Sequence, residues 1–549
     1  MKSQVNGARR MLRLPALAVT GVMVLGVAAC TDNRPESSAG GAGRVPEERD
    51  VAPGKPVSQQ RLGQLKVGVL GTIPTLDPAK NIGAGLYTHT LGLESLLRIG
   101  RDGRLEPWLA DTFEQKSPVV HEYRLRRGVK FSDGSPLTSE DVRYSWEYYA
   151  GKGSPRGHYY ANIAGIATPD ERTVRVTLKV PDASWKYTPA MFWSGIFQKK
   201  FAQAHKKTFG QPGTLMVATG PWKFDSLNPT SGMELSANPH YWGGKPPIGR
   251  ISVTSYTEDN SLALALRSGE IDISPSIGAP KGFDATAGKN TVTTVPTCAT
   301  ALMSMPTQTA PWDDVHVRRA VAYAVDRDSV IASTQGRAGA PQRTLISPLV
   351  MRTLGSKEQV DKALDSVPGY DHDLGKAKAE LSKSKVPHGF SGTFVTSQSA
   401  AAPAQVIADQ LKKIGVKLKI RSMNDTAWAA AVTGPADKRP VTAFETGACL
   451  PDPSFSSVYL GKANTVPGGL NTANYTPPGI DRMIAAGRTT QDPGKRLKIY
   501  TALQKRVGED VPYVPLYAEG AHYASVKYGI AGFDGYTLNM PWALNVVAK

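Results

Sequence analysis

The hydrophobic positions of this chain alternate between the spacing of strands and the spacing of helices. Residues 173–178 (Thr-Val-Arg-Val-Thr-Leu) alternate strictly and predict a half-buried strand. In 495–507, apolar residues recur every three to four positions, which predicts a helix with one buried face. A strand over 393–396, a helix over 404–414 and a strand over 416–420 predict a βαβ unit. The pattern therefore predicts an α/β fold with a mostly parallel sheet, whose ligand sites lie beyond the carboxyl ends of the strands.

Three further helices are predicted from their ends or their apolar runs. Thr138 is a typical N-cap residue, and Asp141 lies in the first turn, where a carboxylate suits the helix dipole. The apolar run 261–268 predicts a buried helix that ends at Gly269. Residues 317–333 predict one continuous helix. These helices extend the α/β pattern over most of the chain.

Residues 1–29 have the pattern of an export signal. Positive charges without an acid precede a mostly apolar run over 14–29, which is too short to span ~30 Å of hydrocarbon but suits a signal peptide. The run closes on Val-Ala-Ala before Cys30, which resembles the lipobox of bacterial lipoproteins, where the thiol receives a diacylglyceryl group. The alternative is an ordinary secretory signal with an incidental cysteine. We favour a lipoprotein that begins at Cys30, on the outer face of the cytoplasmic membrane.

The segment after Cys30 is expected to be a tether. Residues 30–64 are rich in Ser, Gly, Pro and charge and lack apolar periodicity, so we expect a lipid anchor followed by a disordered spacer. From residue 65 the chain has the pattern of a folded protein to its end. This length exceeds one core of ~100–200 residues, so at least two domains are expected.

Charge and motifs favour a binding protein over an enzyme. The formal net charge is +18, but Lys and Arg do not interleave with aromatics, so we expect a basic surface facing an anionic envelope and no nucleic-acid partner. After the leader no apolar run reaches transmembrane length, so the lipid is the expected membrane contact. The sequence lacks Gly-x-Ser-x-Gly, His-Glu-x-x-His, Cys-x-x-Cys and a phosphate-binding Gly-rich loop. We therefore expect no enzymatic activity and no cofactor.

Six sets of short motifs follow one another along the chain. The most specific is 125–142, with a strand, a turn at Ser132-Asp133-Gly134 and a helix. The others are 75–78 (Thr-Leu-Asp-Pro), 219–224 with 238–247, 266–272, 317–327 and 511–517. Together and in this order they resemble one family, the large extracytoplasmic solute-binding proteins of peptide, nickel and opine ABC importers (family 5). The resemblance covers nearly all of the folded chain.

The resemblance implies a type II periplasmic-binding-protein fold in its large three-domain form, with two lobes hinged around a ligand cleft. Lobe I would be discontinuous, made of 65–104, 217–298 and 519–549. Domain II would be inserted at 105–216, and lobe III would be 299–518. The protein would act as a monomer that closes on a small solute and delivers it to an ABC permease with its ATPase, without covalent chemistry.

Hallmark aromatic residues are expected to hold the fold together, and one acid is a candidate ligand contact. Trp222, Tyr241 and Trp242 would pack in the core or between domains. In peptide-binding relatives an acid late in the third lobe pairs with the ligand's α-ammonium, because a desolvated ammonium needs a charged partner. The corresponding acid is Asp452, although the family's Trp-x-x-Asp spacing is absent. Two interpretations stay open: an amine anchor, and a plain Asp-Pro turn.

Other ligand-binding candidates lie on loops. They are Asn81 and Tyr87 after the first strand, Tyr159 and Tyr160 on the inserted domain, and Ser397 and Gln398 at a strand-to-helix switch. Some relatives also carry a disulfide in the third lobe, which implies a Cys298–Cys449 bridge. Neutral polar and aromatic groups suit an oligopeptide.

Other solutes and other classes stay open as alternatives. A nickel chelate, an opine or an oligosaccharide could replace the peptide, but His158 alone does not make a metal site, so no metal is expected. A sensory or scaffold lipoprotein with the same fold is a second alternative. An exported hydrolase is the third, and it would need a nucleophile and a base such as Ser397 and His158.

Overall fold

The protein is described by a computed structural model over residues 61–549, apart from 82–84, 101–102, 153, 155, 276, 278–279, 288–290, 335–338, 398–399 and 446–449. The predicted signal peptide, Cys30 and nearly all of the predicted tether lie outside these described residues. Within them, no helix has the combined length and apolarity needed to cross a membrane.

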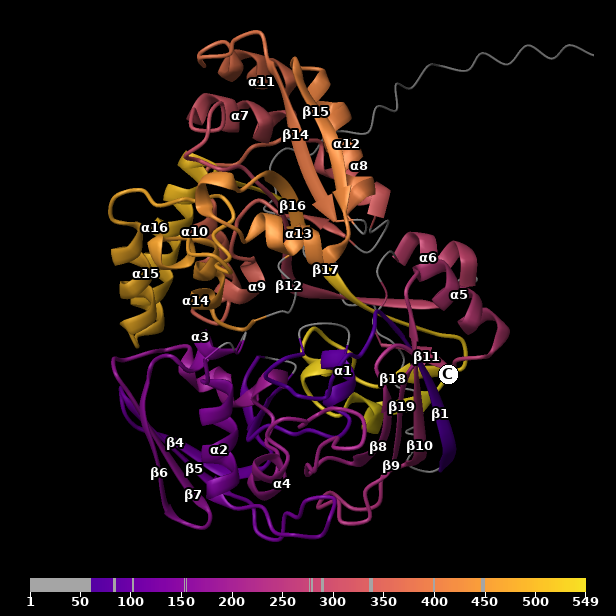
Figure 1. Ribbon diagram of the computed structural model, residues 1–549. Helices are drawn as coiled ribbons and strands as arrows, with labels where there is room; N and C mark the ends of the chain where they lie inside the picture. Colours follow the sequence, from indigo (N-terminus) through magenta and orange to yellow (C-terminus); the bar gives the residue numbers. More distant parts are fainter. Residues whose placement is uncertain are drawn as a thin grey trace, which may run out of the picture. The chain divides into compact units, whose positions relative to one another are not determined.

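The largest sheet has 11 strands in the order β15-β14-β16-β12-β17-β11-β1-β10-β9-β8, with β13 paired to β17 (Figure 1). Its strands are β1 (Leu62–Leu70), β8 (Trp222–Asn228), β9 (Gly232–Ala237), β10 (Ile248–Tyr256), β11 (Ile273–Ser274), β12 (Val292–Ser304), β13 (Ala340–Pro341), β14 (Phe390–Ser397), β15 (Val416–Met423), β16 (Val441–Glu445) and β17 (Tyr513–Ser525). The long strands β12 and β17 pair along their whole length and join the two ends of the sheet, with register shifts near their middle.

The sheet is mixed, so the prediction of a mostly parallel sheet was wrong. Parallel pairing is found for β1 with β10 and β11, and for β14 with β15 and β16. The other pairs of this sheet are antiparallel, including β12 with β17 and with β16. The predicted βαβ unit is confirmed as β14, α12 (Ala401–Lys412) and β15. Local periodicity identified this unit, but it carries no information on how distant strands pair.

A second, antiparallel sheet carries part of the candidate site. It consists of β4 (Ala110–Ser117), β5 (Val120–Leu125), β7 (Thr173–Leu178) and β6 (Ile163–Asp170), in that order. The predicted strand 173–178 is β7. Helix α2 (Ser139–Tyr149) packs on this sheet, and the short α3 (Gly157–Tyr160) follows α2 (Figure 1). Thr138 is the N-cap of α2, and its backbone N–H donates to the Asp141 carboxylate at 3.0 Å, as predicted.

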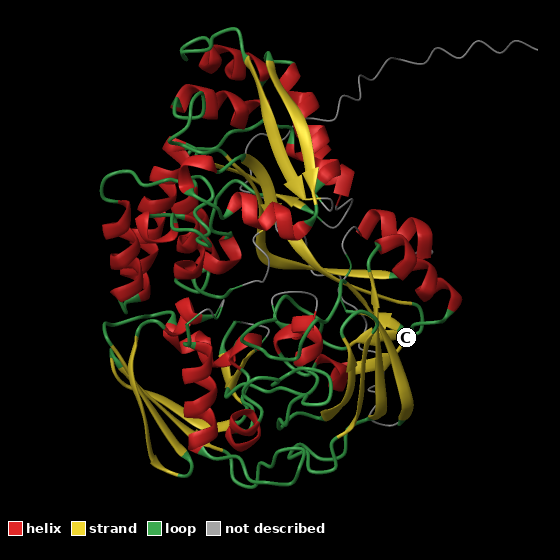
Figure 2. Ribbon diagram, in the orientation of Figure 1, coloured by secondary structure: helices red, strands yellow, loops and turns green. Residues whose placement is uncertain are grey.

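Most of the remaining helices come after β12 in the chain. All described helices are drawn in red in Figure 2. The remaining helices are α1 (Gly85–His89), α4 (Lys199–Ala204), α5 (Asp259–Ser268), α6 (Pro280–Ala287), α7 (Val315–Ala324), α8 (Arg327–Thr334), α9 (Pro348–Met351), α10 (Lys357–Leu364), α11 (Leu374–Leu381), α13 (Asp425–Val432), α14 (Pro453–Ser456), α15 (Ile480–Thr489) and α16 (Pro493–Asp510). Short strands complete the fold: β2 (Leu97–Ile99), β3 (Leu105–Pro107), β18 (Tyr528–Ile530) and β19 (Val546–Ala548).

Two helix predictions had different outcomes. Gly269 ends α5 in the left-handed conformation at a φ of 77°, which confirms the predicted stop. The single helix predicted over 317–333 was wrong, because the chain breaks into α7 and α8. Val325 is extended there, and the Asp326 carboxylate accepts from the backbone of Asp328 at the start of α8. The Asp326 side chain stabilises the start of α8, and this local hydrogen bonding competes with continuation of α7.

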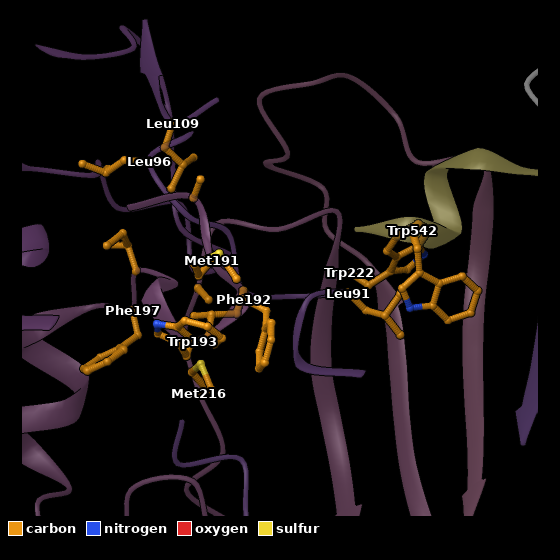
Figure 3. Packing of buried hydrophobic residues seen from close by; sticks show 14 of the residues in the cluster. Leu91, Leu96, Leu109, Met191, Phe192, Trp193, Phe197, Met216, Trp222 and Trp542 are labelled. Carbon is orange, nitrogen blue, oxygen red and sulfur yellow. The ribbon is translucent and has the colours of Figure 1, made fainter. Parts of the chain in front are cut away.

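Aromatic hallmark residues pack in the core, as predicted. Trp222 is buried and donates its indole N–H to the carbonyl of Ile248 at 2.9 Å. Tyr241 is buried too, and Trp242 packs against the same core. Figure 3 shows Trp222 beside Leu91 and Trp542 in this core, with Phe192 and Trp193 farther along it.

Candidate functional site

Five aromatic side chains form a continuous row that links distant segments; we call Tyr87, Phe192, Trp193, Tyr159 and Phe455 the aromatic row. Tyr159 on α3 stacks on Trp193, with ring centroids 4.5 Å apart and 18° between the planes. Tyr159 also meets Phe455 of α14 edge-on at 6.0 Å. At the other end, Tyr87 of α1 lies 6.2 Å from Phe192. The row therefore connects α1, the loop after β7, α3 and α14.

Charges of both signs act on the aromatic row. Arg156 directly precedes α3, and its guanidinium carbon lies 5.9 Å from the centre of the Trp193 ring. Burial raises the pKa of Tyr87, and the negative charge of Glu519 on β17 raises it further. Burial likewise raises the pKa of Tyr459, with smaller contributions from neighbours that include Tyr159 and Glu519. A cation directly before α3 thus lies over one ring of the row, and an anion on the long strand β17 acts on another.

Asn81 and Tyr87, two predicted contacts, lie at the α1 end of this site. Asn81 is fully buried, and its amide donates to the carbonyl of Thr75 at 3.1 Å and lies 3.1 Å from Nε2 of His89. Burial lowers the pKa of His89 to about 4, so its ring is neutral at pH 7. The carbonyl of Asn81 accepts from Arg156 at 3.0 Å. Asn81 therefore holds the segment before α1 and orients Arg156, and Tyr87 belongs to the aromatic row.

Of the two adjacent tyrosines predicted, only Tyr159 belongs to the row. Tyr160 is buried on the opposite side, where it stacks on Tyr149 at 5.6 Å and meets Trp185 edge-on. This arrangement follows from the single turn of α3, in which adjacent side chains diverge. Tyr160 thus packs in the hydrophobic core.

Asp452 is buried and paired with a cation. It caps α14 by accepting from the backbone N–H of Ser454 at 3.0 Å, and Pro453 occupies the first helical position. Its carboxylate also accepts two hydrogen bonds from Arg496 of α16, at 2.6 and 2.8 Å. These contacts correspond to the Asp-Pro turn interpretation, and the amine anchor stays a prediction.

The remaining predicted residues lie elsewhere or outside the described residues. Ser397 ends β14, is buried, and accepts from the backbone N–H of Ala400 at 3.3 Å, while His158 lies against the ring of Tyr159. Cys298 is disulfide-bonded, and its sulfur lies 3.6 Å from the carbonyl oxygen of Leu450. Gln398 and Cys449 lie outside the described residues, so the Cys298–Cys449 pairing stays a prediction. The described part of the chain contains no group of three His, Cys, Asp or Glu that could hold a metal.

An ion pair between Arg488 and Asp182 also joins the segment after β7 to the region of α14 and α15. Arg488 at the end of α15 donates to the buried carboxylate of Asp182 at 2.7 Å through Nε and 2.6 Å through a terminal nitrogen. The backbone N–H of Ala183 donates to the carbonyl of Arg488 at 2.9 Å. These bonds hold the segment after β7 against α15, beside α14.

Several residues of the site were not predicted from the sequence. They are Arg156, Phe192, Trp193, Phe455 and Glu519. The sequence did carry a signal for Phe192 and Trp193, the run Met-Phe-Trp at 191–193 in a segment without strand alternation. Their convergence depends on contacts between segments far apart in the chain.

Solved structures identify the fold of the protein. DppA from Helicobacter pylori, an ABC transporter-associated periplasmic binding protein in complex with the peptide STSA, has a TM-score of 0.76 at 21% identity and covers 89% of this chain and 99% of its own. AgaA in complex with agropinic acid, from A. tumefacien R10, has a TM-score of 0.74 at 25% identity and covers 89% and 99%. The chain thus has the two-lobed periplasmic-binding-protein fold, as predicted.

The family follows from the sequence comparisons. The family model described as bacterial extracellular solute-binding proteins, family 5, matches residues 104–465. The glutathione-binding protein GsiB of Salmonella choleraesuis is 25% identical over 487 residues, which are 85% of this chain and 91% of that protein. The chain belongs to family 5 of the bacterial extracellular solute-binding proteins, the binding proteins of ABC importers, and the resemblance stated from its motifs is confirmed.

Proposed function

We propose that this protein is a lipid-anchored extracytoplasmic receptor that captures an oligopeptide between its lobes and delivers it to an ABC permease. The observation that carries the proposal is the aromatic row, in which Tyr159 of the predicted domain II (105–216) meets Phe455 of the predicted lobe III (299–518). Aromatic faces contribute large contact areas with weak directional demands, so they tolerate varied side chains. A solute held at this row touches both regions and stabilises their closed arrangement.

The relatives favour a peptide over other solutes. One relative is named as a glutathione-binding protein, and a similar structure contains the peptide STSA. Another similar structure contains agropinic acid, which makes an opine the second candidate. A peptide also suits a site that combines aromatic rings with a cation and an anion.

The bound solute should appear directly in the mass spectrum of the native protein. We expect the full-length protein, purified in detergent, to carry a series of short peptides, because a row of aromatic rings binds many side chains with similar strength. Native mass spectrometry followed by denaturation would identify them. A single non-peptide mass or a metal chelate would contradict the peptide assignment and leave the binding role intact. If the protein emerges empty, melting shifts with a peptide library provide the same test.

The lipid anchor predicts a change of cell fraction. In a Cys30→Ser variant we expect the protein to leave the membrane fraction and to lose the mass of its acyl chains. The reason is that each buried CH₂ contributes about 0.8 kcal/mol to membrane binding, and two or more chains hold a protein stably. Fractionation with intact-mass analysis measures both effects. The control is Ser38→Ala in the predicted tether, which should stay in the membrane fraction; an unacylated wild-type protein would contradict the anchor.

A further inference from the structure

We propose that Arg156 and the indole N–H of Trp193 bind a carboxylate of the solute, so that the protein selects solutes with a free carboxylate, such as peptides with an unmodified C-terminus. This inference rests on the proposed function and names the chemical group that the site recognises. The site lies where Arg156 and the Trp193 ring of the aromatic row approach Asn81, in the described part of the segment before α1.

Two neighbouring hydrogen-bond donors at this place lack an acceptor. Arg156 donates through a terminal nitrogen to the carbonyl of Asn81 at 3.0 Å, but its buried Nε–H has no partner. The indole N–H of Trp193, a residue only 3% exposed, has no partner either. More than nine in ten buried polar groups are hydrogen-bonded, and each orphan costs about 1–3 kcal/mol. Two orphans on side chains in contact indicate an acceptor supplied by another molecule.

The charge of Arg156 indicates that this acceptor is an anion. Buried cations are normally paired, because desolvation of an unpaired charge is costly. Among the residues that the structure describes, no ion pair of Arg156 is found, and the groups that act on its pKa besides burial are the hydroxyls of Tyr149, Tyr159 and Tyr160, which carry no charge at pH 7. Burial lowers the pKa of Arg156, in the direction expected when no anion compensates the lost water. Arg156 is half-buried, with its Nε atom inaccessible to solvent, whereas the fully buried Arg496 has Asp452 as its acceptor.

The geometry favours a carboxylate over other anions. A guanidinium is planar and presents its N–H groups as a fork that matches the two oxygens of a carboxylate. Tyr159 and Trp193 stack on each other, 4.5 Å apart and 18° from parallel, and the guanidinium of Arg156 lies over the Trp193 ring beside this stack. The carbonyl of Asn81 fixes one edge of the guanidinium, which leaves the Nε edge for the solute.

The test compares peptides that differ only at the C-terminus. The probes are an equimolar library of tri- to pentapeptides as free acids and the same library amidated, with affinities measured by calorimetry on the full-length protein in detergent. We expect the wild type to bind free acids at least tenfold more tightly. Arg156→Gln should weaken free-acid binding 10- to 100-fold and leave amide binding nearly unchanged, which removes the preference. Trp193→Phe keeps an aromatic ring at this position but removes the indole N–H. It should reduce the preference for free acids over amides by about fivefold.

The control is Arg98→Gln. Arg98 also lies over a tryptophan, Trp108, at 4.8 Å, but its guanidinium is paired with Glu106. This variant should keep the free-acid preference. If Arg156→Gln fails to fold, as judged by its circular dichroism, Trp193→Phe carries the test.

The outcomes separate this inference from the proposed function. Equal binding of acids and amides by the wild type, or a preference that survives in both Arg156→Gln and Trp193→Phe, would overturn the carboxylate site while peptide capture stands. Competition by inorganic phosphate as effective as that of the free acids would overturn selection of carboxylates. Failure of both libraries to bind would overturn the proposed function, and this inference with it.

Discussion

Replacing Arg496 by alanine should lower the free energy of unfolding by about 3–5 kcal/mol. Arg496 and Asp452 are both almost completely buried, with side chains 3% and 1% exposed, and they share two short hydrogen bonds. Removing the cation leaves a carboxylate without its counter-charge in a place that water does not reach. The same change releases α16 from α14, which Asp452 caps, and from α15, because Arg496 also donates to the carbonyl of Gly487 on α15. Urea unfolding followed by circular dichroism measures the effect.

An exposed pair provides the control for this prediction. Lys357 and Asp361 are four residues apart on α10, and the lysine side chain is 65% exposed, so Lys357→Ala should leave the unfolding midpoint nearly unchanged. An Arg496→Ala protein as stable as the wild type would show that the pair is not a structural element.

The companion variant Asp452→Asn separates the two interpretations of this residue. If Asp452 acts through Arg496 and the cap of α14, the variant loses stability, and peptide affinity measured on the folded fraction changes little. If Asp452 anchors the ligand's ammonium, affinity for peptides falls and an N-acetylated peptide becomes as good a ligand as the free amine.

Glu94 should make the stability of the protein fall as the pH rises from about 4.5 to 7. This buried carboxyl accepts from the indoles of Trp108 and Trp242 at 2.9 and 3.1 Å, from Thr219 at 2.8 Å and from Tyr241 at 3.4 Å. Burial nevertheless raises the pKa of Glu94 to about 7, and the hydrogen bonds only partly oppose this. The folded protein therefore holds a proton that the unfolded chain releases near pH 4.5, and the stabilisation is lost as the pH rises through 7.

The measurement is a comparison of the wild type with Glu94→Gln. A raised pKa of this size corresponds to about 3 kcal/mol, so the stability difference between the two proteins should shift by that amount, in favour of the variant, between pH 4.5 and 7.5. Urea unfolding at several pH values gives the difference directly. Glu106→Gln, at an exposed carboxylate paired with Arg98, should follow the wild type at every pH. A difference between wild type and Glu94→Gln that does not change with pH would contradict the assignment.

The elements that could be predicted from the sequence are those that neighbouring residues along the chain determine. The βαβ unit of β14, α12 and β15, the cap at Thr138 and the stop at Gly269 each depend on residues within a few positions of one another. Ordered family motifs predicted the two-lobed fold for the same reason, since each motif is a short strand, turn or helix. The failure at Val325 also has a local cause, because a capping side chain at Asp326 and a continuing helix compete within one turn.

The site itself was decided by tertiary structure. The sequence alone determined the family and the two-lobed α/β fold, and it predicted export and, among the candidate contacts, Tyr87 and Tyr159. It did not reveal that Asp452 faces Arg496, which comes 44 residues later, or that Tyr159 meets Phe455. It also did not reveal the antiparallel pairing of β12 with β17. Spacing along a chain reports which side chains share a face, whereas the partner across an interface depends on how separate segments pack, and that information exists only in the folded molecule.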